Sequence, residues 1–328
     1  MNSVGRLFRI SIYGESHGSE VGVILDGVKP GIPLNKEMFK DDLNRRKAGR
    51  IGTTKRLEKD EIIIKSGVFN GFTTGAPILL TFSNENINSK DYLYLINQPR
   101  PSHADFTAHV KYHGFQDYRG GGHFSGRLTT GLVAAGVVAK KMLPCTFLSR
   151  IIQLGNLKDL TKMDEYLEKI RLSGDSVGGI VEVTVKNMIK GLGEPYFDSL
   201  ESTISHLLFS IGGVKGVEFG IGFKGATLKG SEFNDSFIDE NGTTKTNNNG
   251  GINGGISNGN DLIIKVFVKP TPSIFQKQPT YSFEEKKVIE QKITGRHDVA
   301  IILRAMVVIE NAIACALADS YLIFKAYN

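Results

Sequence analysis

The stretch 100–127, RPSHADFTAHVKYHGFQDYRGGGHFSGR, gathers side chains that move protons and bind anions. It contains four histidines and three arginines around the glycine triplet 120–122, and a fifth histidine, His17, lies in the earlier segment GESHG. Histidine exchanges protons near neutral pH, arginine pairs with carboxylates and phosphates, and glycine lets backbone N–H groups approach an anion. Together these residues indicate proton transfer on a strongly anionic substrate.

The histidines differ in their sequence surroundings. His17 has glycines nearby on both sides, which favours close approach of the backbone to a ligand, although a solvated turn would show the same pattern. His103 is followed by Asp105, which would either fix the tautomer of the imidazole or cap the next helix. His109 and His113 have the i, i+4 spacing of a metal pair, but no further ligand follows at a suitable spacing. We therefore interpret both as ordinary surface or core residues.

Basic residues cluster around the end of a predicted helix. Asp41–Arg45 and Asp42–Arg46 would form i, i+4 ion pairs, which is the structural interpretation of the pattern. The cluster continues past the helix through four further lysines and arginines, so an anion site at the helix end is the alternative. The additional residues are Lys47, Arg50, Lys55 and Arg56.

Other charged residues stand directly before apolar segments. Arg127 opens the segment 127–143, and an arginine at such a boundary needs a partner, which a substrate would supply. Asp298 precedes the last apolar segment and would either cap a helix there or act on a ligand with Arg296. The segment KPTPS, whose backbone is fixed by two prolines, is predicted to lie under a neighbouring loop. It comprises Lys269, Pro270, Thr271, Pro272 and Ser273.

Composition indicates an ordinary soluble globular protein. Of the 328 residues, 40% are hydrophobic and 23% are charged, and a chain of this length buries about three quarters of its unfolded surface. The net charge of +6 would suit a nucleic acid or an acidic small molecule. Because no basic run of the nucleic-acid type is present, we expect no nucleic-acid partner.

The sequence predicts a cytoplasmic protein without a membrane segment. The N-terminus has no apolar stretch of signal-peptide length, and charged residues interrupt the apolar segment 299–325. Cys145 and Cys315 lie among apolar residues, so we expect buried free thiols, with a disulfide as the alternative. Free thiols favour a reducing compartment.

Hydrophobic periodicity predicts an α+β protein without a regular βαβ alternation. A capping box at Thr161 and Asp164 would start one helix, and Asp198 with Glu201 would start another, in which His206 is interpreted as a packing residue. The predicted strands are 20–26, 60–69, 76–82, 180–186, 218–223 and 262–268, and the predicted helices are 35–47, 127–143, 161–172, 199–211, 284–293 and 302–325.

One segment differs in amino-acid composition from the rest of the chain. Residues 241–260, NGTTKTNNNGGINGGISNGN, are rich in Asn and Gly and almost free of apolar side chains. A loop of this length within a compact domain is usually a lid or a binding loop. We predict a single domain over 1–328 with a mobile lid at about 241–260.

The motifs of this chain resemble those of a known family. GESHG, RPSHAD, GGGHFSGRLT, GDSVGG, GLGEPYFD, GGVKG, KPTPS and GRHD, in this order and at these spacings, resemble the chorismate synthase family across essentially the whole chain. Several of these motifs are long and unusual, so the set is far more specific than a lone glycine pattern.

The resemblance implies a fold, an assembly and a reaction. The implied fold is a layered β-α-β sandwich, with long central helices flanked by antiparallel sheets, in a homotetramer. The implied reaction converts 5-enolpyruvylshikimate 3-phosphate to chorismate by 1,4-anti loss of phosphate and the C6 hydrogen, the last common step of the shikimate pathway. It needs reduced FMN without net redox change. The resemblance thus implies a flavoprotein, with FMN, FAD and NADP as the associated nucleotides and an external flavin reductase.

By analogy with the family, His17 would act as an acid on the departing phosphate, His103 would keep the reduced flavin suitably protonated, and Asp298 would serve C6 proton removal. No metal is implied. The implied substrate-binding residues are Ser16, Arg45, Arg46, Arg50, Ser125, Arg127 and Arg296, and the implied cofactor-binding residues are His123, Phe124, Ser125, Gly212, Gly213, Gly254, Lys269, Pro270, Thr271, Pro272, Ser273 and Arg296.

The glycine segment departs from the family pattern. Many members have GGGRSSARET where this chain has GGGHFSGRLT, so the contacts of His123 and Phe124 with flavin, through side chain or backbone, are left open. Two rival functions share the anion-binding residues. A phosphohydrolase using His17 and His103 would turn over without flavin, and a silent flavin-binding member would release no phosphate.

Overall fold

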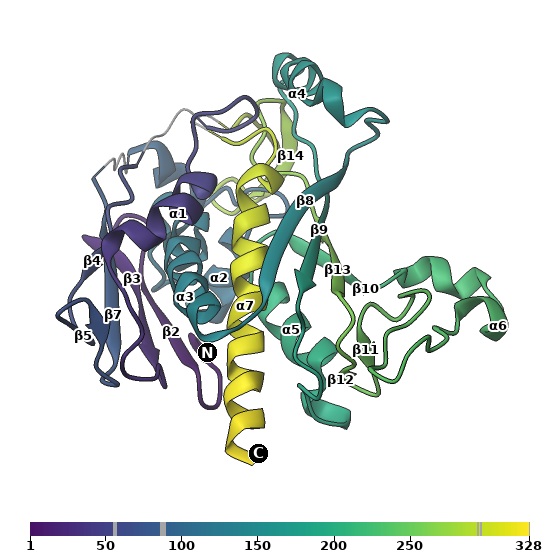
Figure 1. Ribbon diagram of the computed structural model, residues 1–328. Helices are drawn as coiled ribbons and strands as arrows, with labels where there is room; N and C mark the ends of the chain where they lie inside the picture. Colours follow the sequence, from purple (N-terminus) through teal and green to yellow (C-terminus); the bar gives the residue numbers. More distant parts are fainter. Residues whose placement is uncertain (55–57, 86–89, 294, 296, 328) are drawn as a thin grey trace.

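The first of two main sheets is antiparallel, with the strand order β1-β2-β3-β7-β4 (Figure 1). The computed structural model describes residues 1–54, 58–85, 90–293, 295 and 297–327. Within β3, Val21, Val23 and Leu25 are fully buried, as the predicted alternation requires. The strands are β1 (Ser3–Val4), β2 (Arg9–Gly14), β3 (Glu20–Asp26), β4 (Ile63–Ile64) and β7 (Ile78–Ser83).

The second sheet is also antiparallel, with the order β10-β13-β9-β8. Its inner face is built from branched aliphatic residues: Val181, Val183 and Val185 of β9 are fully buried, which suits a pleated surface packed on helices. The strands are β8 (Thr146–Leu154), β9 (Gly179–Lys186), β10 (Val214–Phe219) and β13 (Leu262–Val268).

Two long helices lie between the sheets (Figure 1). α3 (Thr129–Met142) packs on β3 and β7, whereas α7 (Ile302–Tyr327) packs on β8 and β9. The two helices approach closely because Gly136 has no side chain, and a Cβ there would overlap the Cβ of Asn311. The predicted α+β sandwich with central helices is confirmed.

The helix α7 is 26 residues long. By length and composition it would be able to cross a membrane, but most of it is buried inside the protein. That is the environment of a core helix in a soluble protein. Cys315 of this helix is a buried free thiol as predicted, whereas the free thiol of Cys145 is only half-buried.

Shorter elements connect these layers. Asn35 caps the first of them as predicted, since its side chain accepts from the Met38 N–H at 3.3 Å. The helices are α1 (Lys40–Arg46), α2 (Asp105–Lys111), α4 (Met163–Leu172), α5 (Leu200–Phe209) and α6 (Gly230–Phe233); the two-stranded sheets are β5 (Val68–Phe69) with β6 (Phe72–Thr73), β11 (Ile252–Asn253) with β12 (Ile256–Ser257), and β14 (Gln278–Ser282) with β15 (Lys287–Gln291); the 3-10 turns are η1 (Lys36–Phe39), η2 (Lys90–Ile96), η3 (Arg119–Phe124), η4 (Gly126–Leu128), η5 (Leu160–Lys162), η6 (Tyr196–Asp198) and η7 (Gly222–Thr227).

The helix predicted over 284–293 is wrong. This segment forms β15, which pairs with β14 so that Val288 lies opposite Tyr281 and Ile289 opposite Thr280. Its lysines and glutamates are good helix formers, but pairing of β-branched residues with a neighbouring strand outweighs that local preference.

Two other predicted boundaries are also wrong. The strand predicted at 218–223 begins at Val214 and ends at Phe219, because Gly220 and Gly222 adopt positive φ angles of 58° and 59° that end the strand. The helix α5 is capped by Ser199, whose hydroxyl accepts from the Ser202 N–H at 3.1 Å, rather than by the predicted acidic pair.

Residues 241–260 lie at the right of Figure 1, beside β10 and α6. Asp235 organises this segment, because its carboxylate accepts from Thr246 Oγ1 at 2.7 Å and from the backbone N–H groups of Asn248 and Asn249 at 2.7 and 2.9 Å. The asparagines therefore contribute backbone and side-chain hydrogen bonds to a built loop. Movement of the loop as a lid stays a prediction.

Candidate active site

A cavity of about 830 Å³ is lined by parts of the chain that are far apart in sequence. They include the N-terminal strands, the end of α1, the segment 120–129, the end of α5, the segment 269–273 and the start of α7. Its volume is at the large end of the ~300–1,000 Å³ typical of ligand sites. The cavity can therefore hold a cofactor beside a small substrate.

The cavity is strongly basic. Among the residues that the structure describes, seven lysine and arginine side chains line it against three carboxylates. Such an excess of cations over low-dielectric walls attracts anions. The cations are Arg46, Lys47, Arg100, Arg127, Lys215, Lys269 and Arg304, and the carboxylates are Glu58, Asp60 and Asp298.

Two of these arginines share one buried carboxylate. Asp60 forms an ion pair with Arg46 at 3.2 Å and another with Arg127, and all three side chains are almost fully buried. Burial lowers the pKa of Arg46 below its ordinary value, and the nearby charges of Arg304 and Arg127 act in the same direction. One carboxylate thus faces two cations, and an incoming anion would balance the second.

Asp298 is held at the start of α7 by two donors. Its Oδ1 accepts from the Thr54 N–H at 2.8 Å, and its Oδ2 accepts from Arg304 at 3.1 Å. Because α7 begins only at Ile302, Asp298 is not the cap of that helix, and the capping interpretation is wrong. Its carboxylate is instead oriented on the cavity wall.

His103 also lies on this wall, between two charged residues. Its Nδ1 is 2.7 Å from Asp105 Oδ1 and 3.0 Å from Arg100 Nη2. Burial lowers the pKa of His103, opposed by the hydrogen bond to Asp105 and aided by the charge of Arg100. Asp105 makes no capping bond in α2, whose N-cap position has none. Of the two sequence interpretations of Asp105, the structure supports orientation of His103.

The glycine triplet packs against the GESHG loop. Gly120, Gly121 and Gly122 all have positive φ angles, and a Cβ on Gly120 would overlap the ring of His17. The carbonyl of Gly122 accepts from the Ser16 N–H at 3.1 Å. Ser16 and His17 are therefore buried behind the triplet, and only Gly120 of this group lines the cavity.

A separate part of the wall is formed by 212–213 and 269–273. The Lys269 N–H donates to the Gly213 carbonyl at 2.9 Å, which joins the two segments. Thr271 Oγ1 is buried and has no hydrogen-bond partner among the residues described. Elsewhere on the cavity wall, His123 Nδ1 lies 2.8 Å from the Gly14 carbonyl, whereas the ring of Phe124 is half-exposed.

The structure does not bring every predicted residue to the cavity. Arg45 points into the core and pairs with Glu310 at 2.6 Å and with Asp42 at 2.8 Å, so its predicted pairing with Asp41 is wrong, as is that of Arg46 with Asp42. Arg50 donates to the carbonyls of Arg45 and Leu303. Pro270 and Gly254 do not line the cavity as described, and Arg296 lies outside the described residues.

Several lining residues were not singled out from the sequence. Asp60 and Arg304 carry no local motif of their own, whereas Arg100 and Lys215 stand in the motifs RPSHAD and GGVKG but were not assigned to the site. Only folding brings all four to the wall. His206 was interpreted as packing, but it is exposed and lines the cavity. For Arg304, the position two residues after the start of an apolar helix was an available signal.

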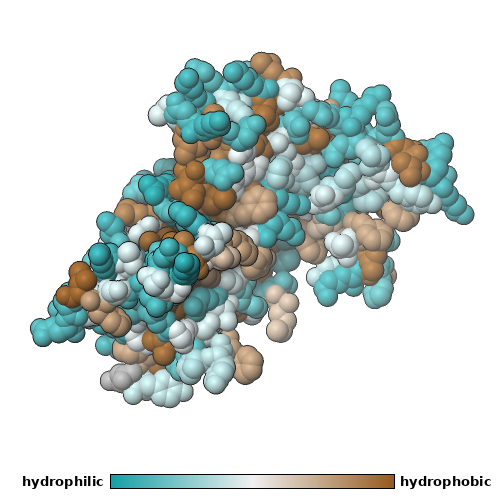
Figure 2. Space-filling view, turned by 90° about the vertical axis from the view of Figure 1, so that its right-hand side faces the viewer, coloured by the Kyte–Doolittle hydropathy of each residue, from teal (hydrophilic) through white to brown (hydrophobic). Residues whose placement is uncertain are grey.

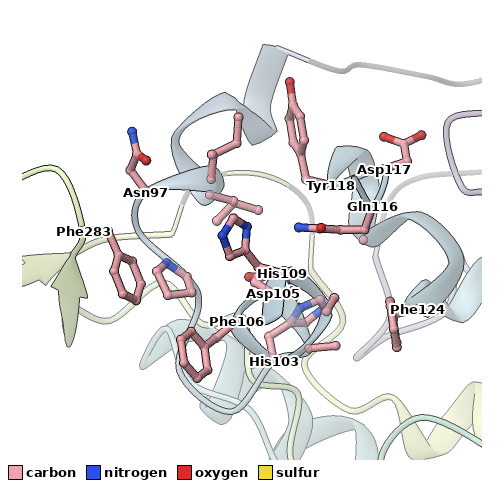
Figure 3. A pocket seen from close by; sticks show the side chains of 16 residues that line it. Asn97, His103, Asp105, Phe106, His109, Gln116, Asp117, Tyr118, Phe124 and Phe283 are labelled. Atoms are coloured by element: carbon pink, nitrogen blue, oxygen red, sulfur yellow. Dashed lines mark ion pairs between the residues drawn. The ribbon is translucent and has the colours of Figure 1, made fainter. Parts of the chain in front are cut away.

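A smaller cavity of about 190 Å³ shares His103 and Phe124 with the large one. Figure 3 shows His109 in its middle, with Gln116 pointing toward it and Phe106 and Phe283 at one edge. His103 therefore stands between two cavities. Among the described residues, no group of three or more His, Cys, Asp or Glu side chains is placed to hold a metal ion.

Comparison with known proteins decides the family. The family model described as chorismate synthase matches residues 8–322. The chain belongs to the chorismate synthase family. This confirms the resemblance seen in the motifs and the expectation of a phosphate-eliminating lyase of the shikimate and aromatic amino-acid pathway.

The curated relatives cover the whole chain. A chorismate synthase of Chitinophaga pinensis is 53% identical over 100% of this chain and 98% of its own length. One of Thermococcus gammatolerans is 44% identical over 99% of this chain and 98% of its own length. A crystal structure of a chorismate synthase superposes with a TM-score of 0.74 at 25% identity, covering 98% of this chain and 93% of that chain.

Proposed function

We propose that this member of the chorismate synthase family eliminates phosphate and the C6 hydrogen of 5-enolpyruvylshikimate 3-phosphate in the 1,4-anti sense, with reduced FMN in the same cavity. The observation that carries the proposal is the basic cavity itself, which combines seven cations with Asp298 and His103 on its wall. The substrate has two carboxylates and a phosphate, and clustered arginines and lysines suit such a molecule.

The cavity also fits a flavin. Thr271 Oγ1 supplies an unsatisfied buried hydroxyl, and Gly212 leaves open space along one wall. The aliphatic side chains of Leu132 and Ile301 line the cavity. These residues, with 123–125, would hold the cofactor. Bound reduced FMN supplies electron density that assists loss of phosphate and is recovered when the proton leaves.

The protein's own groups bind and orient the substrate. Arg46 and Arg127 would receive the anionic groups, since Asp60 balances only one of their two charges. The carboxylate of Asp298, fixed by Thr54 and Arg304, would serve removal of the C6 proton. Such proton-transfer groups typically contribute ~10²–10⁴-fold to the rate.

The histidines have separate roles in this proposal. His103 faces the cavity and would control the protonation of the reduced cofactor. His17 is 5% exposed and packs edge-on against Tyr92 at 5.3 Å between ring centroids, and Tyr92 lines the cavity. To act on the departing phosphate, His17 would need the glycine triplet to move aside.

We also propose that the protein is a cytoplasmic homotetramer and that an external flavin reductase supplies it with reduced FMN. Figure 2 shows apolar residues, in brown, reaching the surface in several patches on one face, and exposed aromatic residues such as Phe197 and Phe223 suit subunit contacts. Nothing in the described site selects FAD or NADP, so neither nucleotide is part of the proposal.

The decisive test is anaerobic turnover of 5-enolpyruvylshikimate 3-phosphate, with FMN plus dithionite and without flavin. Phosphate release should accompany chorismate absorbance only when reduced FMN is present. Phosphate released without flavin or chorismate would instead indicate a hydrolase. Binding of FMN and substrate without any release of phosphate would indicate a silent member of the family.

A further inference from the structure

The ring of His103 is contacted by charges of opposite sign at the same nitrogen. Asp105 Oδ1 lies 2.7 Å from Nδ1, and Arg100 Nη2 lies 3.0 Å from it. Arg100 and Asp105 are also paired with each other through two side-chain bonds of 2.8 Å. Figure 3 shows His103 and Asp105 at the wall of the small cavity.

The two contacts favour opposite protonation states of Nδ1. A carboxylate oxygen only accepts hydrogen bonds, so the 2.7 Å contact with Asp105 favours a hydrogen on Nδ1. A guanidinium only donates, so the 3.0 Å hydrogen bond with Arg100 Nη2 favours a lone pair on Nδ1. Asp105 and Arg100 therefore compete at the same ring nitrogen.

We propose that Arg100 and Asp105 are positioning residues that orient His103 through Nδ1 and set its proton affinity by opposing charges. This inference rests on the proposed role of His103 toward the reduced cofactor. Asp105 alone would make His103 a cation, because an adjacent carboxylate stabilises the imidazolium. Arg100 opposes that effect, because its own hydrogen bond at Nδ1 favours the unprotonated nitrogen.

The surrounding charges support this arrangement. Lys269 is the other cation that acts on His103, and it opposes protonation as Arg100 does. Asp117, which lines the small cavity with His103, is paired with Arg119 at 2.8 Å. Asp105 is therefore the one described carboxylate that contacts the ring directly, and its charge is shared with Arg100.

Arg100 is anchored well enough to perform this function. It is 7% exposed, and its other amino group lies 3.3 Å from Ser273 Oγ in the predicted cofactor segment. Asp105 also accepts from the Arg100 backbone N–H at 3.0 Å. The guanidinium is thus fixed on three sides, which keeps its charge beside the ring.

The test measures the pKa of His103 directly in the full-length enzyme. NMR of histidine-labelled protein would follow its Cε1–H signal with pH, assigned by its loss in His103→Gln. Arg100→Gln should raise the pKa by about one unit or more, and Asp105→Asn should lower it by a similar amount. The double variant leaves neither charge unpaired and should fall between the single variants. Glu168→Gln, in an exposed pair with Arg171, is the matched control and should leave the pKa unchanged.

The same variants are assayed for the pH dependence of kcat/KM. If Arg100 and Asp105 had only packing roles, their variants would not shift the pKa of His103 in opposite directions. Shifts of the same sign, or a double variant whose pKa lies outside the range of the single variants, would therefore overturn the inference. Opposite pKa shifts with an unchanged pH–rate profile would uphold the positioning role and refute the proposed function of His103. If one single variant does not fold, the other is compared with wild type and with the double variant. Removal of Arg100 should raise the pKa, and removal of Asp105 should lower it, in whichever background is available; a shift of the opposite sign would overturn the inference.

Discussion

Replacement of Asp60 by Asn should strongly destabilise the protein and tighten its binding of anions. Asp60 is the shared partner of Arg46 and Arg127, and the three side chains are at most 5% exposed. Removing one partner of a buried ion pair typically costs ~3–5 kcal/mol, a large part of the ~5–15 kcal/mol that stabilises a typical domain. Asn is the suitable substitution because residue 60 has a φ of 50°, which Asn tolerates.

The assay is denaturant unfolding with and without inorganic phosphate. Asp60→Asn should unfold at a clearly lower denaturant concentration than wild type, and phosphate should restore more stability to the variant because both arginines then lack a counter-ion. Glu85→Gln is the control, since Glu85 forms an exposed pair with Lys59 worth only ~0–1 kcal/mol. An unfolding midpoint equal to that of wild type, with no added response to phosphate, would refute the counter-ion role of Asp60.

Three further predictions concern the catalytic wall and the core. Asp298→Asn should lower kcat by about 10²–10⁴-fold with substrate affinity retained, as measured by single turnover and equilibrium binding; a near-normal kcat would contradict the role. Burial alone would raise the pKa of Glu310, but hydrogen bonding to Arg45 and other donors lowers it overall. The stability from this carboxylate is therefore present above its unfolded pKa and lost as pH falls through the folded value, so the difference in unfolding free energy between wild type and Glu310→Gln should shrink in acid. Gly136→Ala should cost about 1–3 kcal/mol by overpacking against Asn311 in the same unfolding assay, and an unchanged midpoint would contradict this.

The sequence predicted elements whose hydrophobic pattern agrees with their final environment. The alternation in 20–26 and the apolar run in 302–325 identified a strand and a helix because burial follows their own periodicity. The segment 284–293 was misassigned because its charged residues favour a helix locally, whereas its strand pairs with 278–282. Such pairing depends on residues that a local pattern does not include.

The candidate site was also predicted only in part from the sequence. Motif matching identified Arg127 and Asp298, which line the cavity, but it did not distinguish Arg45 from Arg46. These adjacent residues leave α1 in different directions, one toward Glu310 and the other toward Asp60. Asp60 itself was missed because its two partners come from separate segments, so that its function arises only after folding.

One helix fixes both arginines of α1 at once. Arg304 of α7 donates to the Arg46 carbonyl at 2.9 Å, and Glu310, six residues later, pairs with the Arg45 side chain. Six helical residues advance about 9 Å and turn through about 600°, so deleting one residue between them would rotate one contact by about 100° relative to the other. A single span of helix therefore keeps the anion site and the charged core in register. A length change there would disconnect substrate binding from the core even if the deleted residue, such as Val307, does not itself line the cavity.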